Sequence, residues 1–95
     1  MKIQAVVINS KDNVATVVGD FPASTIIHFF VGQSERSVQL LQDIPLGHKF
    51  AIQEKNVGEE IFKYAETIGV ATSLIQTGQH VHVHNMETQR GRKDQ

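Results

Sequence analysis

Three of the five histidines of this 95-residue chain stand at alternate positions, within the segment GQHVHVHN at residues 78–85. Successive side chains of a β-strand point to opposite faces, so His80, His82 and His84 share one face if this segment is a strand. The two intervening valines then share the other face. The pattern predicts a half-buried strand that carries a row of imidazoles.

Imidazole is a common metal ligand, and histidine is the side chain whose unperturbed pKa lies nearest neutrality. Alternate residues of a strand lie about 6.5 to 7 Å apart, which is long for three ligands of one tetrahedral ion but short enough for two. The row is therefore interpreted as a metal half-site with His80, His82 and His84 as candidate ligands, as a proton-transfer station, or as a solvated strand face. Spacing alone leaves these three interpretations open.

Further residues suited to acid–base chemistry lie near turns and strand ends. His48 and Lys49 directly follow a glycine, and Lys63 and Tyr64 end an apolar segment. Together with the histidine row they offer a base, cations for a carboxylate and metal ligands. We take His48, Lys49 and Tyr64 as candidate catalytic residues, and Lys63 and Asn85 as candidate substrate-binding residues. The alternative is that the lysines are solvated strand residues and the tyrosine ring simply packs.

The composition limits the class of protein. The length predicts one domain, and the absence of cysteine excludes disulfides, thiolate metal sites and cysteine nucleophiles. The net charge of −1 is dispersed along the chain, so we expect neither a nucleic-acid nor a membrane partner. The N-terminal apolar run is too short for a secretion signal or a membrane span, and we expect a cytoplasmic protein. Neither a nucleophile elbow nor a phosphate-binding glycine loop is present in the sequence.

Short strands separated by turns are the elements predicted to position the candidate residues. Ala65 to Ile75 is the one segment with a possible helical turn, and residues 32–37 read as a turn. His28 lies among apolar neighbours, so we assign it to packing in the core or at a sheet edge. The predicted strands outside the histidine region are residues 3–8, 14–18, 25–31 and 38–41.

A weak internal repeat accompanies this pattern. Residues 44–52 and 75–83 share an isoleucine, two spacers, a glycine and a polar pair that leads into an apolar segment, and residues 55–64 repeat the glycine turn without a histidine. We interpret all three as turn-then-strand units. The domain is predicted to span residues 1–86. Residues 87–95 form a polar tail whose basic cluster is too short to indicate nucleic acid and is better suited to docking on a partner.

Several of these segments together resemble one known family. IPLGHKF at 44–50, IFKYAETIG at 61–69, Ala71-Thr72 and GQHVHVHN at 78–85 resemble the N-terminal region of the altronate and galactarate dehydratase family, as does DNVA at 12–15. The family usually has glycine where this chain has Ala65, which puts a turn or close backbone approach there in question. Residues 22–43 match the family poorly.

The resemblance implies a mainly β fold, a small SAF-type β-clip domain. It also implies an iron(II)- or manganese(II)-dependent lyase that removes water from a sugar acid to give a 2-keto-3-deoxy acid. The basic tail resembles the end of separately encoded small subunits, so we expect a larger dehydratase-like subunit as partner and no activity from this chain alone. The alternatives are the small subunit of a related enzyme that eliminates sulfite from sulfolactate, and a non-catalytic SAF module that binds a carbohydrate or a protein. Assembly into a homo-oligomer is also left open.

Overall fold

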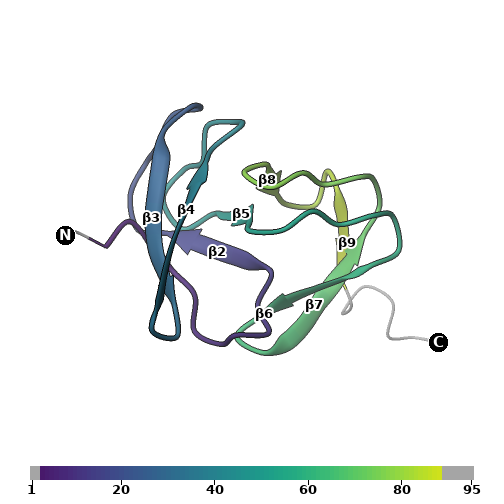
Figure 1. The fold of residues 1–95 in the computed structure, drawn as a ribbon. Helices are drawn as coiled ribbons and strands as arrows, with labels where there is room; N and C mark the ends of the chain where they lie inside the picture. The colour runs from purple at the N-terminus through teal and green to yellow at the C-terminus, as the bar shows by residue number, and fades with distance from the viewer. Residues whose placement is uncertain (1–2, 89–95) are drawn as a thin grey trace.

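The computed structural model describes residues 3–88, and within that range the chain forms nine short strands and no helix (Figure 1). The predicted mainly β fold is confirmed. No helix in the described range is therefore long and apolar enough to span a membrane. The strands are β1 (Ala5–Val6), β2 (Val14–Val17), β3 (Ile26–Val31), β4 (Ser34–Gln39), β5 (Lys49–Ala51), β6 (Glu60–Lys63), β7 (Glu66–Ala71), β8 (His80–Val81) and β9 (Met86–Thr88).

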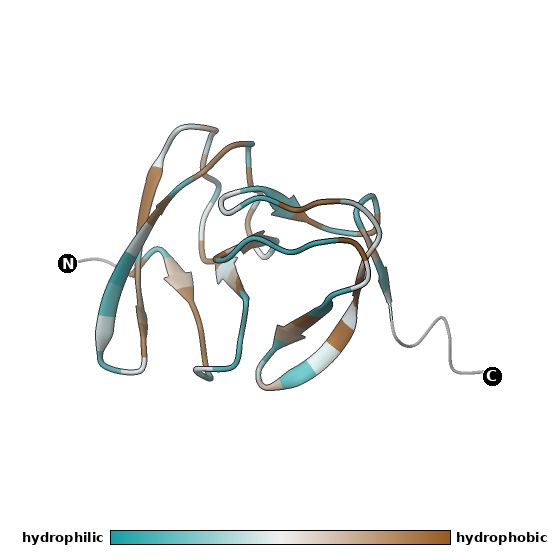
Figure 2. Ribbon diagram, turned by 45° about the vertical axis from the view of Figure 1, so that its right-hand side comes forward, coloured by the Kyte–Doolittle hydropathy of each residue, from teal (hydrophilic) through white to brown (hydrophobic). Residues whose placement is uncertain are grey.

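The strands form three small antiparallel sheets, with the orders β1-β2-β5-β8, β3-β4 and β6-β7-β9. Figure 1 shows the β3-β4 hairpin on one side of the central sheet and the β6-β7-β9 sheet on the other. Most of β4 is hydrophilic, as Figure 2 shows, and five of its six residues are exposed. The central sheet therefore connects the two flanking sheets. Hydrophobic side chains pack between the central sheet and each of its neighbours.

Two separate hydrophobic cores result, and the central strand β5 contributes to both. Phe50 packs edge-to-face against Phe29 in the first core, with ring centroids 5.9 Å apart. Its neighbour Ala51 faces the second core, which contains Ile61, Ile75 and Val81. Because successive residues of a strand face opposite sides, one three-residue strand joins both cores. Full burial of a side chain as large as Phe50 contributes about 1.5–3 kcal/mol.

The internal repeat corresponds to a recurring tight turn. In the three predicted copies the residue with positive φ is Gly47 (84°), Gly58 (88°) or Gly78 (92°). In each, the next N–H donates to the carbonyl three residues back, at 2.9, 3.0 and 3.0 Å respectively. A positive φ at the third position is the property of a type II turn, and glycine adopts it at no steric cost. The predicted turn-then-strand units are confirmed.

A fourth copy of this turn was not predicted. It precedes β3, and its residue with positive φ is Ser24 (77°) rather than glycine. The four turns meet in pairs, through antiparallel bridges between Phe21 and Ile44 and between Lys55 and Ile75. The sequence did not reveal this copy, because the repeat was identified by its glycines and this turn has a serine in that place.

Two element predictions outside the histidine region were wrong. The segment with a possible helical turn contains the strand β7, which pairs with β6 and β9. Gly69 lies inside β7, where a Cβ would clash with the carbonyl oxygen of Glu87, so the pairing with β9 depends on this glycine. The turn predicted at residues 32–37 is shorter, since β4 begins at Ser34. Polarity on both faces made this edge strand look like a loop.

The hairpin between β6 and β7 turns through two non-glycine residues with positive φ, Tyr64 (56°) and Ala65 (68°). Two consecutive positive φ values are the property of a type I′ hairpin turn. The buried Asp12 fixes this turn by accepting a 2.7 Å hydrogen bond from the N–H of Ala65. The chain thus retains the turn at the position where the resembling family usually has glycine.

At the C-terminal end, β9 includes Glu87 and Thr88, which pair with Val70 and Gly69 of β7. The strand therefore extends two residues into the segment predicted as a tail. The remaining tail, residues 89–95 with its predicted partner-docking basic cluster, lies outside the described residues.

Candidate functional site

His48 and His80 meet at one edge of the central sheet. His48 is the last residue of the turn that leads into β5, and His80 begins β8, whose register on β5 pairs it with Phe50. Their facing nitrogens, Nδ1 of His48 and Nε2 of His80, lie 2.9 Å apart. At this distance one nitrogen donates a proton to the lone pair of the other, so at least one of the two facing nitrogens is unprotonated.

The predicted long histidine strand is wrong beyond Val81. After Val81 the chain turns, and the N–H of Asn85 donates to the carbonyl of His82 at 3.0 Å. The two valines consequently do not share a face, because Val81 is fully buried whereas Val83 is 67% exposed. The alternation of histidine and valine in the sequence predicted a continuous strand and gave no sign of the turn.

The turn nevertheless gathers the imidazoles more closely than a strand would. The ring centroid of His82 lies 5.2 Å from that of His48 and 5.8 Å from that of His80, and the centroid of His84 lies 5.4 Å from that of His80. We refer to His48, His80, His82 and His84 as the histidine cluster. It joins all three predicted metal ligands to one predicted catalytic residue.

Asn85 lies beneath the histidine cluster and is 1% exposed. Its Oδ1 accepts a 3.0 Å hydrogen bond from the N–H of His82, and its Nδ2 donates a 2.8 Å hydrogen bond to the carbonyl of His80. The amide therefore fixes the backbone from which two of the histidines project. The sequence suggested that Asn85 binds substrate, which stays a prediction, whereas the geometry gives this residue a supporting position.

The electrostatic environment favours the neutral form of His80 and of His82. Burial, reinforced by the neighbouring histidines and Lys49, lowers the pKa of His80 to about 4. Burial and then Lys49 lower the pKa of His82 as well. The pKa of Lys49 itself is lowered by burial and by Lys63. Lys49 thus adds positive potential at His80 and His82, and Lys63 acts on Lys49. The predicted substrate-binding role of Lys63 stays a prediction.

Tyr64 lies apart from this group. It projects from the β6-β7 turn, where the Nζ of Lys63 lies 4.9 Å from its ring centroid. Figures 1 and 2 both show this turn at the bottom of the molecule and β8 near the top. The predicted catalytic role of Tyr64 therefore stays a prediction, without support from proximity to the histidines.

The donor set of the cluster suits a transition metal, because neutral imidazole nitrogens bind zinc, iron, copper and nickel. Within residues 3–88, however, no group of three or more histidine, aspartate or glutamate side chains could hold a metal ion in the arrangement observed. The chemistry of the residues thus fits a metal, and their present rotamers do not complete a site.

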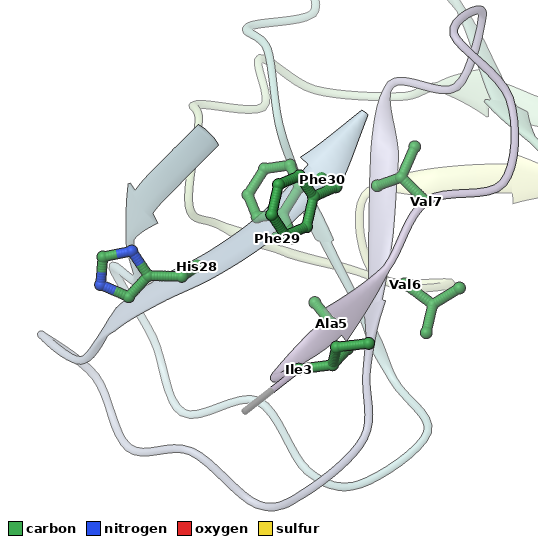
Figure 3. Close-up of a pocket in the computed structure, with 7 residues that line it drawn as sticks. All are labelled: Ile3, Ala5, Val6, Val7, His28, Phe29 and Phe30. Atoms are coloured by element: carbon green, nitrogen blue, oxygen red, sulfur yellow. The ribbon is translucent and has the colours of Figure 1, made fainter. Parts of the chain in front are cut away.

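A second feature lies far from the cluster, near the N-terminus. A half-open apolar pocket of about 150 Å³ lies between β1 and β3. Figure 3 shows His28 at its margin, with the imidazole pointing away from Phe29 and Phe30. The Nδ1 of His28 lies 3.9 Å from a carboxylate oxygen of Glu35, and the side chain is 44% exposed. His28 is thus a half-exposed residue of a two-stranded hairpin and does not lie in the core.

The chain is thus an all-β domain with repeated glycine turns and a histidine-rich sheet edge, and these features define its structural class. The chain belongs to the altronate/galactarate dehydratase SAF domain family, whose family model matches residues 3–89. This confirms the family expected from the sequence motifs.

Among individual proteins, the chain is similar to altronate dehydratase of Escherichia coli, with 37% identity over 93 residues that cover 98% of this chain and 18% of that enzyme. It is also similar to (2R)-sulfolactate sulfo-lyase subunit alpha of Chromohalobacter salexigens, with 38% identity over 93 residues that cover 95% of this chain and 99% of that subunit. The same subunit of Paracoccus pantotrophus is 44% identical over 48 residues, covering 50% of this chain and 72% of the subunit. These relatives are lyases, and the chain spans less than a fifth of the dehydratase but nearly all of the sulfo-lyase subunit.

The sequence placed His48 in one site with the histidine row, but it did not predict the direct contact between His48 and His80. The internal repeat carried a signal for it, because it placed Gly47 and Gly78 at the same position of two turns that each lead into a strand. Two such strands, if paired antiparallel, bring the histidines after both turns to one sheet edge. The pairing partner of each strand was the missing information.

Proposed function

We propose that this chain is the small subunit of a two-subunit lyase of the altronate dehydratase type, which removes water from a sugar acid to give a 2-keto-3-deoxy acid. The observation that carries the proposal is the convergence of the histidine cluster and Lys49 on one edge of an SAF domain. The similarity to a separately encoded alpha subunit over nearly its whole length supports a larger partner chain.

The proposed reaction is a β-elimination. A base removes the proton α to the carboxylate, an acid protonates the hydroxyl on the next carbon so that it leaves as water, and the resulting enol becomes the 2-keto acid. Lys49 adjoins the histidine cluster and is the proposed base, while the Lys63 ammonium attracts the substrate carboxylate into the same region. A divalent metal held by the histidines, iron(II) or manganese(II), would supply further positive charge for the developing negative charge.

The partner supplies the walls of the site in this proposal. Neither the apolar pocket beside β1 nor the shallow hollow between Asp20 and Asp43 includes a residue of the histidine cluster. A sugar acid needs a concave site that surrounds most of its surface. The histidine-bearing edge is therefore the proposed docking face for the larger subunit.

Sulfolactate is the second candidate substrate. The chain covers 99% of a sulfolactate sulfo-lyase alpha subunit, so the subunit architecture favours this enzyme as strongly as the family favours a dehydratase. The two reactions share the removal of a proton α to a carboxylate, and they differ in the leaving group, which is hydroxyl in one and sulfite in the other. The small subunit can therefore have the same role in both.

The test is a reconstitution with the proposed larger dehydratase-like subunit. Turnover of altronate, galactarate and (2R)-sulfolactate is assayed with the small chain alone, the large chain alone and both together, anaerobically with ferrous iron. We expect activity only from the mixture, and loss of that activity on Lys49→Met. Lys55→Met is the matched control, because Lys55 belongs to a turn bridge that includes no cluster residue.

Each arm has a decisive outcome. Turnover by the small chain alone would contradict a shared site. Full activity of the large chain alone would reduce this domain to an accessory binding module. Activity on sulfolactate but on neither sugar acid would select the second candidate.

A further inference from the structure

We infer that Gln42 is a positioning residue for the histidine cluster, and that its side-chain amide holds His80 where its ring meets that of His48. Gln42 lies outside the cluster, in the segment between β4 and the turn that leads into β5. Its importance for turnover rests on the proposed function, in which the cluster forms part of the reaction site. Its effect on the arrangement of the rings does not depend on that function.

His80 connects the members of the cluster. Its ring centroid lies 5.1 Å from that of His48, 5.8 Å from that of His82 and 5.4 Å from that of His84. A displacement of His80 therefore changes its contact with each of the other three rings. The 2.9 Å contact between its Nε2 and Nδ1 of His48 is the most sensitive, because a hydrogen bond weakens steeply when its geometry departs from the optimum.

The backbone of His80 lies at an open sheet edge. β8 is the last strand in the order β1-β2-β5-β8, so within residues 3–88 no further strand of this sheet pairs with its outer side. The residue before His80 already bonds to β5, because the carbonyl of Gln79 accepts a hydrogen bond from the N–H of Ala51 at 3.0 Å. Bonds to a partner strand alternate along an antiparallel pair, so the N–H and carbonyl of His80 point away from β5, toward the open edge.

Two side-chain amides bind these outward backbone groups in place of a neighbouring strand. Oε1 of Gln42 accepts a 2.9 Å hydrogen bond from the N–H of His80, and Nδ2 of Asn85 donates a 2.8 Å hydrogen bond to its carbonyl. Asn85 belongs to the same turn as the histidines, so it can move together with them. Gln42 is 38 residues away in the sequence, and its bond therefore ties His80 to a distant part of the chain.

The residues on both sides of Gln42 are themselves held. The N–H of Leu41 donates to the carbonyl of Gly78 at 2.9 Å, which attaches the segment to the turn that precedes β8. Oδ1 of Asp43 accepts a 2.8 Å hydrogen bond from the N–H of Ala23, which attaches it to the turn that precedes β3. A supporting side chain holds a functional group precisely when its own position is fixed, and Gln42 meets this condition.

The test uses three variants of the full-length chain. Gln42→Met removes the amide oxygen at similar side-chain length, since a thioether is only a weak acceptor, whereas Gln42→Glu keeps an oxygen at the accepting position. Gln39→Met is the matched control, because the exposed Gln39 donates its amide to the carbonyl of Ser24 at 3.3 Å. Circular dichroism and thermal unfolding establish that each variant is folded, and we expect melting temperatures within about 8 °C of the wild type.

Nuclear magnetic resonance at about pH 8, where free imidazole is neutral, measures the arrangement of the rings directly. The two signals are the hydrogen exchange of the His80 amide and the nitrogen–nitrogen coupling across the hydrogen bond between His48 and His80. In Gln42→Met we expect exchange at least about threefold faster and loss of the coupling. Gln42→Glu and Gln39→Met should keep the wild-type coupling. Wild-type signals in Gln42→Met, equal losses in Gln39→Met, or no rescue by Gln42→Glu would each overturn the inference.

The kinetic readout uses the small chain reconstituted with the larger subunit. Gln42→Met should lower kcat about 10- to 100-fold and change KM less than about threefold, and Gln42→Glu should restore most of kcat. A wild-type kcat in Gln42→Met would overturn the positioning role. Absence of turnover with the wild-type chain would instead contradict the proposed function, and the magnetic resonance measurements on the chain alone would still decide whether Gln42 fixes the pair of rings.

Discussion

The glycines of the recurring turn allow a sharp test of how the histidine edge is built. Gly47, Gly58 and Gly78 have φ values of 84°, 88° and 92°, so alanine at each position introduces a similar backbone strain. That strain is about 1 kcal/mol for a residue with a Cβ. The three positions differ in the space available, because a Cβ at Gly47 or Gly58 has no atom within 4 Å.

A Cβ at Gly78 would clash with the carbonyl oxygen of Gln39, and it would lie 3.3 Å from that carbonyl carbon and 3.4 Å from Cγ of Leu41. The obstacle is backbone, which cannot rotate away as a side chain can. The same turn is held by hydrogen bonds from the N–H of Gly78 to the carbonyl of Ala51 and from the N–H of Leu41 to the carbonyl of Gly78, at 2.8 and 2.9 Å. Overpacking of this kind costs about 1–3 kcal/mol beyond the strain.

We therefore expect Gly58→Ala and Gly47→Ala to lower the free energy of unfolding by about 1 kcal/mol, and Gly78→Ala to lower it by about 2–4 kcal/mol. For a domain of this size each kcal/mol corresponds to about 4–8 °C in melting temperature. Urea unfolding followed by far-ultraviolet circular dichroism measures the differences. If Gly78→Ala were no less stable than Gly58→Ala, the close packing of this turn against Gln39 would be refuted.

Three further predictions concern residues near the site and the hairpin. Ala65→Gly should raise the free energy of unfolding by about 0.5–1 kcal/mol in urea titrations, since Ala65 has a φ of 68° that glycine adopts freely, and a decrease would contradict the strain argument. Asn85→Ala should lower it by about 2–4 kcal/mol and displace the nuclear magnetic resonance signals of the His80 and His82 rings, because it leaves the partly buried N–H of His82 and carbonyl of His80 without their partner. His28→Gln should change the melting temperature by less than about 4 °C and leave the reconstituted activity intact, because the half-exposed ring makes only a 3.9 Å contact with Glu35.

The sequence predicted the local features of this fold better than the relations between distant segments. Glycine spacing located three of the four turns because a positive φ selects glycine, and Ser24 hid the fourth. β-Branched residues located β2 and β3, but the exposed edge strand β4 looked like a loop. The rings of His80, His82 and His84 do lie near one another, but the predicted continuous strand was wrong, because alternation over a few residues is equally compatible with a strand that ends in a turn.

The location of the histidine cluster follows from how the two cores divide the molecule. Phe50 of β5 belongs to the first core and Val81 of β8 belongs to the second, so hydrophobic side chains fill the interior beside the central sheet. The polar residues at the starts of these strands, His48, Lys49 and His80, are left at the edge of the sheet. A site at such an edge is supported from beneath by the strand pairing and by Asn85, and neither of the two hollows described above includes one of its histidines. A small domain of this design can position ligands and a base precisely enough for chemistry, but it depends on a second surface to exclude water and hold the substrate, which is why we place the larger subunit on this edge.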